Sequence, residues 1–262
     1  MIGRLACAAA AGLVLLTACT AAKDVVTGGP KKEPAPQVGA CRVLEPKDID
    51  QPSNDSDVVP CGDTHTAETF RVGSFGGKLA NAAYDSLDLG AAVYRDCNKR
   101  YMKFTGADDS LALRTILSWA WFRPSEDAWK AGSRWYRCDV VGGGDHSTKL
   151  VDLPKSAKGV LLGIPSDKWM SCVNGPSVTD AVRVPCTDKH NWRAVTTIVV
   201  GQPKQKYPGD RLVEVQTRDY CSDSVGAWLN YPIDYKYAYT WFHKNEWLAG
   251  NRRSICWAGT KQ

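Results

Sequence analysis

The sequence lacks the features by which several classes of protein are recognised. It has no block of clustered basic residues, although 33 lysine and arginine residues against 28 aspartate and glutamate residues give a net charge of +5. A positive charge this modest and this dispersed keeps a protein soluble and does not indicate a nucleic-acid partner. We therefore expect no binding to nucleic acid.

Catalytic signatures are also missing. The chain contains no Gly-x-Ser-x-Gly, no phosphate-binding glycine loop and no His-Glu-x-x-His, the motifs that place a nucleophile, a phosphate or a catalytic zinc ion. The best acid–base candidate is His65 with Glu68, whereas a second histidine, His190, is followed at the same spacing by Arg193. We expect a non-enzymatic protein without a cofactor, and a wall hydrolase using His65 and Glu68 is the less favoured alternative.

The longest apolar run lies at the N-terminus, at 5–16, and it is too short to span a bilayer core of about 30 Å as a helix. A basic start, an apolar stretch and small residues at its end predict a secretory signal peptide over 1–18. Its end, Leu16-Thr17-Ala18-Cys19, resembles the lipobox of bacterial lipoproteins. That resemblance implies cleavage before Cys19 and a palmitate-bearing lipid on its thiol; an ordinary signal peptide is the alternative.

The segment 19–38 is rich in proline and glycine and has no apolar periodicity. Such a composition is typical of a disordered tether. With the lipidated Cys19 it predicts a protein held at the extracytoplasmic face of the cell membrane through its lipid anchor. Envelope or division proteins and peptidoglycan are the expected partners there.

Cysteines are the feature in excess, with ten in the chain. Outside the membrane no thiol pool keeps them reduced, so we expect disulfides. No Cys-x₂₋₄-Cys pair suggests structural zinc, and we expect no metal. The predicted disulfide cysteines fall into two sets of four: Cys41, Cys61, Cys97 and Cys138, then Cys172, Cys186, Cys221 and Cys256.

Four cysteines allow three pairings, which sequence alone leaves open. We favour the first with the second and the third with the fourth in each set. The third lies on the apolar face of a predicted helix, and the fourth lies in a strand that this helix should cover.

Two phrases recur in the chain. Val59-Pro60-Cys61-x-x-x-His65 returns as Val184-Pro185-Cys186-x-x-x-His190. Trp129-x-x-Gly132-x-Arg134 returns as Trp247-x-x-Gly250-x-Arg252. A shared order of rare residues with a period of about 125 residues indicates an internal duplication. The expected units are 39–145 and 169–262, with 146–168 as a linker or an edge of the first unit.

Each unit is predicted to be α+β, with one helix packed on an antiparallel sheet. In the first unit we expect strands at 66–75, 111–122 and 134–141 and a helix at 80–101. The apolar face of this helix is expected to carry Tyr84, Leu87, Ala91, Tyr94 and Tyr101. In the second we expect strands at 192–200, 235–242 and 252–257 and a helix at 211–229, with Trp228 on its apolar face.

Tryptophan provides the second interpretation of function. Flat aromatic side chains stack well on sugars, so a peptidoglycan- or glycan-binding module is the main alternative. Tryptophans inside the repeated phrases are expected in the core. Those outside them are the surface candidates: Trp119, Trp135, Trp169 and Trp192.

Taken together, these phrases resemble the bacterial septum formation family, whose members are tethered extracytoplasmic domains, often duplicated. Gly39-Ala40-Cys41, the first Val-Pro-Cys-x-x-x-His phrase with Glu68, and the tryptophan–arginine phrase ending at Cys138 carry the resemblance. The second unit departs from it, with Asn191-Trp192-Arg193 after His190. The resemblance implies a role in division or envelope building, and it identifies no catalytic residue.

Overall fold

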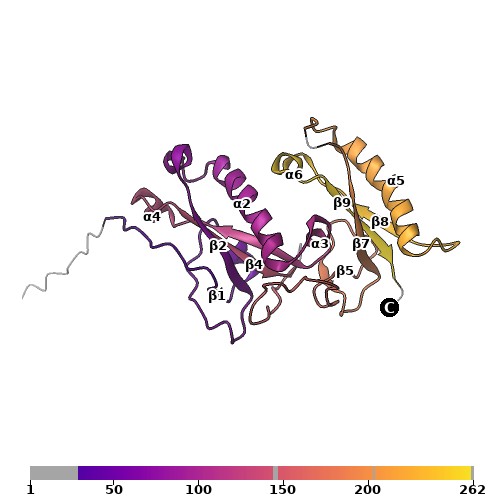
Figure 1. The fold of residues 1–262 in the computed structure, drawn as a ribbon, viewed down its shortest axis with the longest axis horizontal. Coiled ribbons are helices and arrows are strands. Elements are labelled where there is room, and N and C mark those ends of the chain that lie inside the picture. Colours follow the sequence, from indigo (N-terminus) through magenta and orange to yellow (C-terminus); the bar gives the residue numbers. More distant parts are fainter. Residues whose placement is uncertain (1–28, 144–146, 203, 261–262) are drawn as a thin grey trace, which may run out of the picture.

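The computed structural model describes residues 29–143, 147–202 and 204–260. The predicted signal peptide and Cys19 lie outside these residues. Two antiparallel sheets lie side by side, and one long helix covers a face of each (Figure 1). Helix and antiparallel sheet in this arrangement confirm the α+β class.

The first sheet has the strand order β1-β2-β4-β3. Its strands are β1 (Cys41–Arg42), β2 (Ala67–Ser74), β3 (Leu117–Phe122) and β4 (Trp135–Gly142). The long helix is α2 (Leu87–Thr105), and the short helical elements are α1 (Pro46–Ile49), η1 (Gly77–Asn81), α3 (Asp109–Leu113) and α4 (Glu126–Lys130).

The second sheet has the order β6-β5-β7-β9-β8. Its strands are β5 (Ser171–Val173), β6 (Arg183–Pro185), β7 (Trp192–Val199), β8 (Tyr237–Thr240) and β9 (Arg253–Gly259), and its helices are α5 (Asp210–Trp228) and α6 (Lys244–Ala249). Apart from the extra strand β6, the two orders match. The helices α2 and α5 each have 19 residues. A register shift falls between Thr69 and Arg71 in β2 and between Ala194 and Thr196 in β7.

Helix α2 begins later than the sequence predicts. The Ser86 side chain accepts a hydrogen bond from the backbone N–H of Asp88 and caps the helix, and 77–81 forms a separate 3₁₀ turn. The buried face carries Leu89, Val93, Cys97 and Tyr101 at a spacing of four. The prediction that Tyr84 and Leu87 lie on this face was wrong, because the aromatic pattern was extended through the cap. Leu87 is 90% exposed.

The expected strand at 111–122 is a helix in its first part. The Asp108 carboxylate accepts a hydrogen bond from the backbone N–H of Leu111 at 2.6 Å and so starts α3. Helix α3 lies against β7 of the second unit. The second long helix agrees with its predicted bounds, but Trp228 at its end is 51% exposed and does not join Cys221 and Val225 in the core.

The disulfides pair each cysteine with the next one along the chain, the arrangement favoured from sequence. Cys97–Cys138 joins α2 to β4, and Cys221–Cys256 joins α5 to β9. The other two bonds, Cys41–Cys61 and Cys172–Cys186, tie the first strand of each unit to the segment that follows it.

Part of the predicted tether is docked. The backbone N–H of Glu33 donates to the Ser133 hydroxyl at 2.8 Å, and that hydroxyl donates to the Glu33 carbonyl at 3.1 Å. The Glu33 carboxylate also accepts a hydrogen bond from the Ser125 hydroxyl at the start of α4. Composition indicated disorder over 19–38, but within 29–38 these hydrogen bonds hold the chain against the first unit. Residues 19–28 lie outside the described part.

The segment after β4 also belongs to the first unit. Leu153, Ala157 and Leu161 are buried in the core beneath α2. The backbone N–H of Leu161 donates to the carbonyl of Thr105, the last residue of α2, at 2.9 Å. The described part of 146–168 is therefore an edge of the first unit.

An ionic cluster fixes α2 to its sheet. The Asp96 carboxylate accepts hydrogen bonds from Arg71 at 2.6 Å, from Arg100 at 2.8 Å and from the Tyr136 hydroxyl at 2.8 Å. Partial burial raises the pKa of Asp96, but these three hydrogen bonds outweigh it and lower the pKa to about 2.

Because the pKa of Asp96 is lowered, we expect the free energy of unfolding to depend on pH in the acid range. A carboxyl whose folded pKa lies below its unfolded value of about 3.9 adds stability above that value and loses it as pH falls towards 2. We expect wild-type stability to fall between about pH 4 and pH 2 by roughly 1 kcal/mol more than that of Asp96→Asn, since solvent screens the partly exposed pair. Chemical denaturation at several pH values measures this, and parallel curves for the two proteins would contradict it.

Each sheet has a second face, which its long helix does not cover, and this face differs in chemistry between the two units. In the first unit this face holds a buried polar network of Arg42, Thr69, Arg137 and Asp139. The strand registers place Val173, Ala194, Ile255 and Trp257 at the corresponding positions of the second unit. There they form an apolar cluster. The same sheet position is therefore ionic in one unit and hydrophobic in the other.

Candidate functional site

The two histidines of the repeated phrase are buried and equivalent. His65 and His190 are each 1% exposed. The Nδ1 of His65 lies 2.8 Å from the carbonyl oxygen of Asp63, and the Nδ1 of His190 lies 2.8 Å from that of Asp188. Because a carbonyl only accepts, each Nδ1 is the donor. Both histidines therefore close the turn that follows the Pro-Cys dipeptide.

Glu68 holds the segment after β4. Its carboxylate accepts hydrogen bonds from the Ser156 hydroxyl at 2.9 Å and from the backbone N–H of Ala157 at 2.6 Å. Arg193, at the corresponding position of the second unit, donates to Asp167 at 2.6 Å. The two positions fasten the connecting segment from opposite ends. In the described residues no hydrogen bond joins His65 to Glu68, so this pair is placed for structural contacts.

A potential metal-binding group occurs in the second unit. Ligand atoms of Cys172, Cys186 and His190 lie within 4.8 Å of one another. The two sulfur atoms form a disulfide, whereas zinc is bound by thiolates. The group is therefore a disulfide beside a histidine.

The repeated Trp-x-x-Gly-x-Arg phrase builds the same turn twice. Arg134 Nη1 donates to the carbonyl oxygens of Trp129 at 2.6 Å and of Ser133 at 2.7 Å. Its guanidinium also lies over the Trp129 ring, 4.2 Å from the centroid. The intervening Gly132 has φ +96°, which favours glycine. Arg252 and Trp247 repeat this geometry, with the guanidinium 3.5 Å from the ring centroid.

Replacing this arginine tests the structural role. Arg134→Lys keeps the charge but loses the planar stacking and the paired donors, so we expect a loss of about 2 kcal/mol in unfolding free energy. Lys130→Arg, on the neighbouring helix α4 and exposed, is the control and should change stability by less than about 0.5 kcal/mol. Urea denaturation compares the two, and a fully stable Arg134→Lys protein would refute the role.

The tryptophans proposed as a surface are mostly covered. Trp135 and Trp169 are buried. Trp119 packs against Tyr94 with ring centroids 5.8 Å apart, and the Trp192 indole donates to the Gly175 carbonyl at 3.1 Å. The expectation of an exposed set was wrong for Trp135, at the start of β4, and for Trp169, in the turn before β5. Absence from the repeated phrases does not show what covers a side chain.

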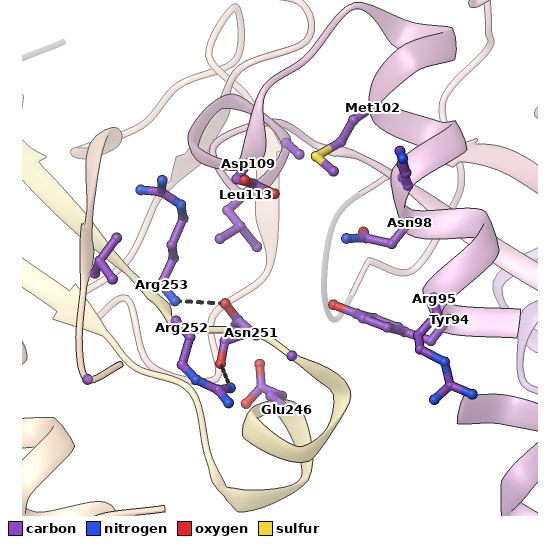
Figure 2. Close-up of a pocket in the computed structure, with 15 residues that line it drawn as sticks. Tyr94, Arg95, Asn98, Met102, Asp109, Leu113, Glu246, Asn251, Arg252 and Arg253 are labelled. Atoms are coloured by element: carbon purple, nitrogen blue, oxygen red, sulfur yellow. Dashed lines mark hydrogen bonds between the residues drawn. The ribbon is translucent and has the colours of Figure 1, made fainter. Parts of the chain in front are cut away.

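An open groove lies between the two units. It consists of two hollows of about 640 and 660 Å³ that share Leu113, Glu246 and Arg253. One wall is a face of α2, and the other runs from α6 into the start of β9 (Figure 2). The floor comes from α3 and the start of β3. Both walls carry polar side chains, among them Asn98 on one and Arg252 on the other.

Direct contacts between the units form the base of the groove. The Thr197 hydroxyl donates to the Ser110 hydroxyl at 2.8 Å, and Arg114 donates to the Val195 carbonyl at 3.1 Å. Below them the backbone N–H of Ile116 donates to the Trp169 carbonyl at 2.9 Å. These bonds connect β7 and the turn before β5 to the chain around α3, which sets the spacing of the walls.

The groove carries charges of both signs. Cations line the first hollow at Arg95, Lys99, Arg252 and Arg253, and carboxylates line it at Asp109 and Glu246. The second hollow adds one charge of each sign, at Arg183 and Asp180. Partial burial and the nearby carboxylates of Glu246 and Asp109 raise the pKa of Tyr94. Glu246 also accepts a hydrogen bond from the backbone N–H of His243 at 2.8 Å, which caps α6.

Sequence reasoning did not identify this groove. Its residues come from segments on either side of the connection between the units, and no short motif links them. The spacing of Tyr94, Asn98 and Met102, which lie four residues apart on the less buried side of α2, was the available signal.

Comparisons with known proteins identify one relationship. The sequence profile described as septum formation matches residues 38–256. No curated protein and no solved structure matches the chain.

Proposed function

The chain belongs to the septum formation family, and from that premise we propose that it is a non-enzymatic interaction module of the cell envelope that acts in division. The observation that carries the proposal is the open groove with charged walls between two disulfide-stapled units. His65 and Glu68, the acid–base candidates, take part in structural hydrogen bonds. A binding role accounts for both features.

The two units are copies of one domain in this proposal. The shared strand order, helix length, register shift and disulfide positions support a duplication. The loss of the glutamate at Arg193 and the apolar cluster in place of the ionic network are then changes in the second copy. Duplication matters for function because the groove is formed only where two units meet.

The proposal includes a lipid anchor at Cys19. In the described residues no helix is both long and apolar enough to cross a membrane. The lipobox supports lipidation, and the tether from Cys19 reaches the first unit at Glu33. In this reading the lipid holds the protein on the extracytoplasmic face of the membrane, near the wall and the division machinery.

The anchor has a direct test with a matched control. Cys19→Ser should abolish incorporation of labelled palmitate and move the protein from the membrane fraction to the soluble fraction, because acyl chains supply the membrane affinity. Cys7→Ser, inside the predicted signal peptide, should change neither. Membrane retention of the Cys19→Ser protein without a lipid label would refute the lipid anchor.

The division role is tested by location. We expect the full chain, with a fluorophore active outside the membrane fused after Gln262, to concentrate at new septa relative to the lateral envelope. An even distribution in dividing cells would contradict the division role and leave a general envelope protein.

A further inference from the structure

We propose that the inter-unit groove binds an extended, acidic peptide segment of a partner protein. This inference rests on the proposed interaction role and adds the chemistry of the ligand. Four features of the groove support it: free sheet edges, side-chain amides with groups left to donate, a cationic excess and aromatic rings that contact other rings.

Two sheet edges open into the groove. Strand β3 pairs only with β4, and β8 pairs only with β9, so each is the edge of its sheet. The start of β3 at Leu117 and Ser118 and the end of β8 at Thr240 line the same hollow. Edge strands present unpaired backbone N–H and C=O groups, which an extended peptide satisfies by adding a strand.

Side-chain amides face each other across the groove. Asn98 on α2 is half-buried, and its side chain makes no hydrogen bond within the described part of the chain. Asn251 on the opposite wall accepts a hydrogen bond from the backbone N–H of Arg253 at 2.8 Å, which leaves its NH₂ group to donate. Figure 2 shows the two amides directed towards the same space. A primary amide both donates and accepts, so it pairs well with a peptide group.

Charge selects an acidic peptide. In the first hollow four cations stand against two carboxylates. Across the described residues, Arg95, Lys99 and Arg253 make no ion pair. Cations on the walls of a groove attract and orient carboxylates of a ligand. Leu113 on the floor and Met102 on the α2 wall provide an apolar surface for the aliphatic side chains between the carboxylates of the ligand.

The aromatic residues argue against a sugar ligand. The Tyr94 ring contacts the Trp119 ring, and the Trp241 ring has two ring neighbours, Tyr239 and His243, with centroids 5.8 and 5.9 Å away. Stacking on a sugar needs a free ring face. The groove therefore offers hydrogen bonds and charge more readily than a stacking platform.

The test uses the full-length protein in detergent on an array of short random-sequence peptides. We expect the bound peptides to be enriched in aspartate and glutamate. Lys99→Glu should weaken binding of a selected acidic peptide about tenfold, since it turns an attraction into a repulsion. Lys103→Glu, one turn further along α2 and outside the groove, is the matched control and should bind as the wild type does. Asn98→Leu should weaken binding without changing the preference for acidic residues.

Three results would overturn the inference. Bound peptides without an acidic bias would exclude an acidic peptide as the ligand. Binding by the Lys99→Glu protein that equals wild-type binding would exclude the groove as the binding site. Binding of purified glycan strands that carry no peptide, with no peptide bound, would assign the groove to sugars. None of these results changes the localisation experiment, so a failure here is distinct from a failure of the division role.

Discussion

Asp139→Ala is expected to lower the free energy of unfolding by about 3 to 5 kcal/mol, because it removes the only carboxylate from a buried network with two arginines. Asp139 accepts hydrogen bonds from Arg137 at 3.0 Å and from the Thr69 hydroxyl at 2.7 Å. Thr69 accepts in turn from Arg42 at 3.0 Å. Without Asp139 both guanidinium groups stay buried with no opposing charge. Burial, with the charge of Arg137, already lowers the pKa of Arg42.

The second unit supplies the matched control. We expect the combined replacement Arg42→Val, Thr69→Ala, Arg137→Ile and Asp139→Trp to cost less than Asp139→Ala alone, because a buried ion network exchanges for well-packed apolar residues at little cost. Urea denaturation followed by tryptophan fluorescence measures both proteins. A small effect of Asp139→Ala, below about 1 kcal/mol, would show that the network contributes little.

Loss of the Cys97–Cys138 bond is the second large effect. The bond closes a separation of 41 residues, against 14 for Cys172–Cys186. On the chain-entropy account, closing the longer loop contributes about 4 kcal/mol to the free energy of unfolding, and closing the shorter loop contributes about 3 kcal/mol. Replacing Cys97 and Cys138 by alanine should therefore destabilise the protein more than replacing Cys172 and Cys186 by alanine. The same alteration also removes the covalent link between α2 and its sheet.

The ranking of these two bonds is the decisive measurement. Both double variants are unfolded by urea under non-reducing conditions, where the remaining disulfides stay intact. The reverse order would show that native packing around the sulfur atoms, and not the closed loop, controls stability. A variant with Cys41 and Cys61 replaced, at an intermediate separation of 20 residues, should fall between them.

The sequence predicted what local pattern determines. Helix α5 was placed within one residue of its bounds because Asp210 and its apolar spacing mark it clearly. The helix start at Ala80 was wrong because Tyr84, before Ser86, continued the apparent helical period. Tyr84 packs against Trp129 from the preceding loop, with ring centroids 5.9 Å apart. Tertiary contacts of this kind leave no trace in periodicity.

The candidate site was predicted less well for the same reason. His65 and His190 stood out because they recur, and Glu68 because it follows His65 at a spacing that suits an acid–base pair. The structure places all three in structural hydrogen bonds. Residues that recur in both units are those that the shared fold requires. The groove depends on what differs between them, since α2 forms one wall and α6 the other. Only the three-dimensional arrangement brings Asn98 towards Asn251.

The disulfide order has a consequence for how the protein is made. A chain threaded N-terminus first through an export channel releases its cysteines one at a time. When the second cysteine of each disulfide leaves the channel, its native partner is already outside. An oxidase that joins consecutive thiols during translocation therefore produces the native set directly. In the export route proposed above, maturation would then need such an oxidase but no isomerase to reshuffle wrong bonds, and the first unit would be fully cross-linked while the second is still in the cytoplasm.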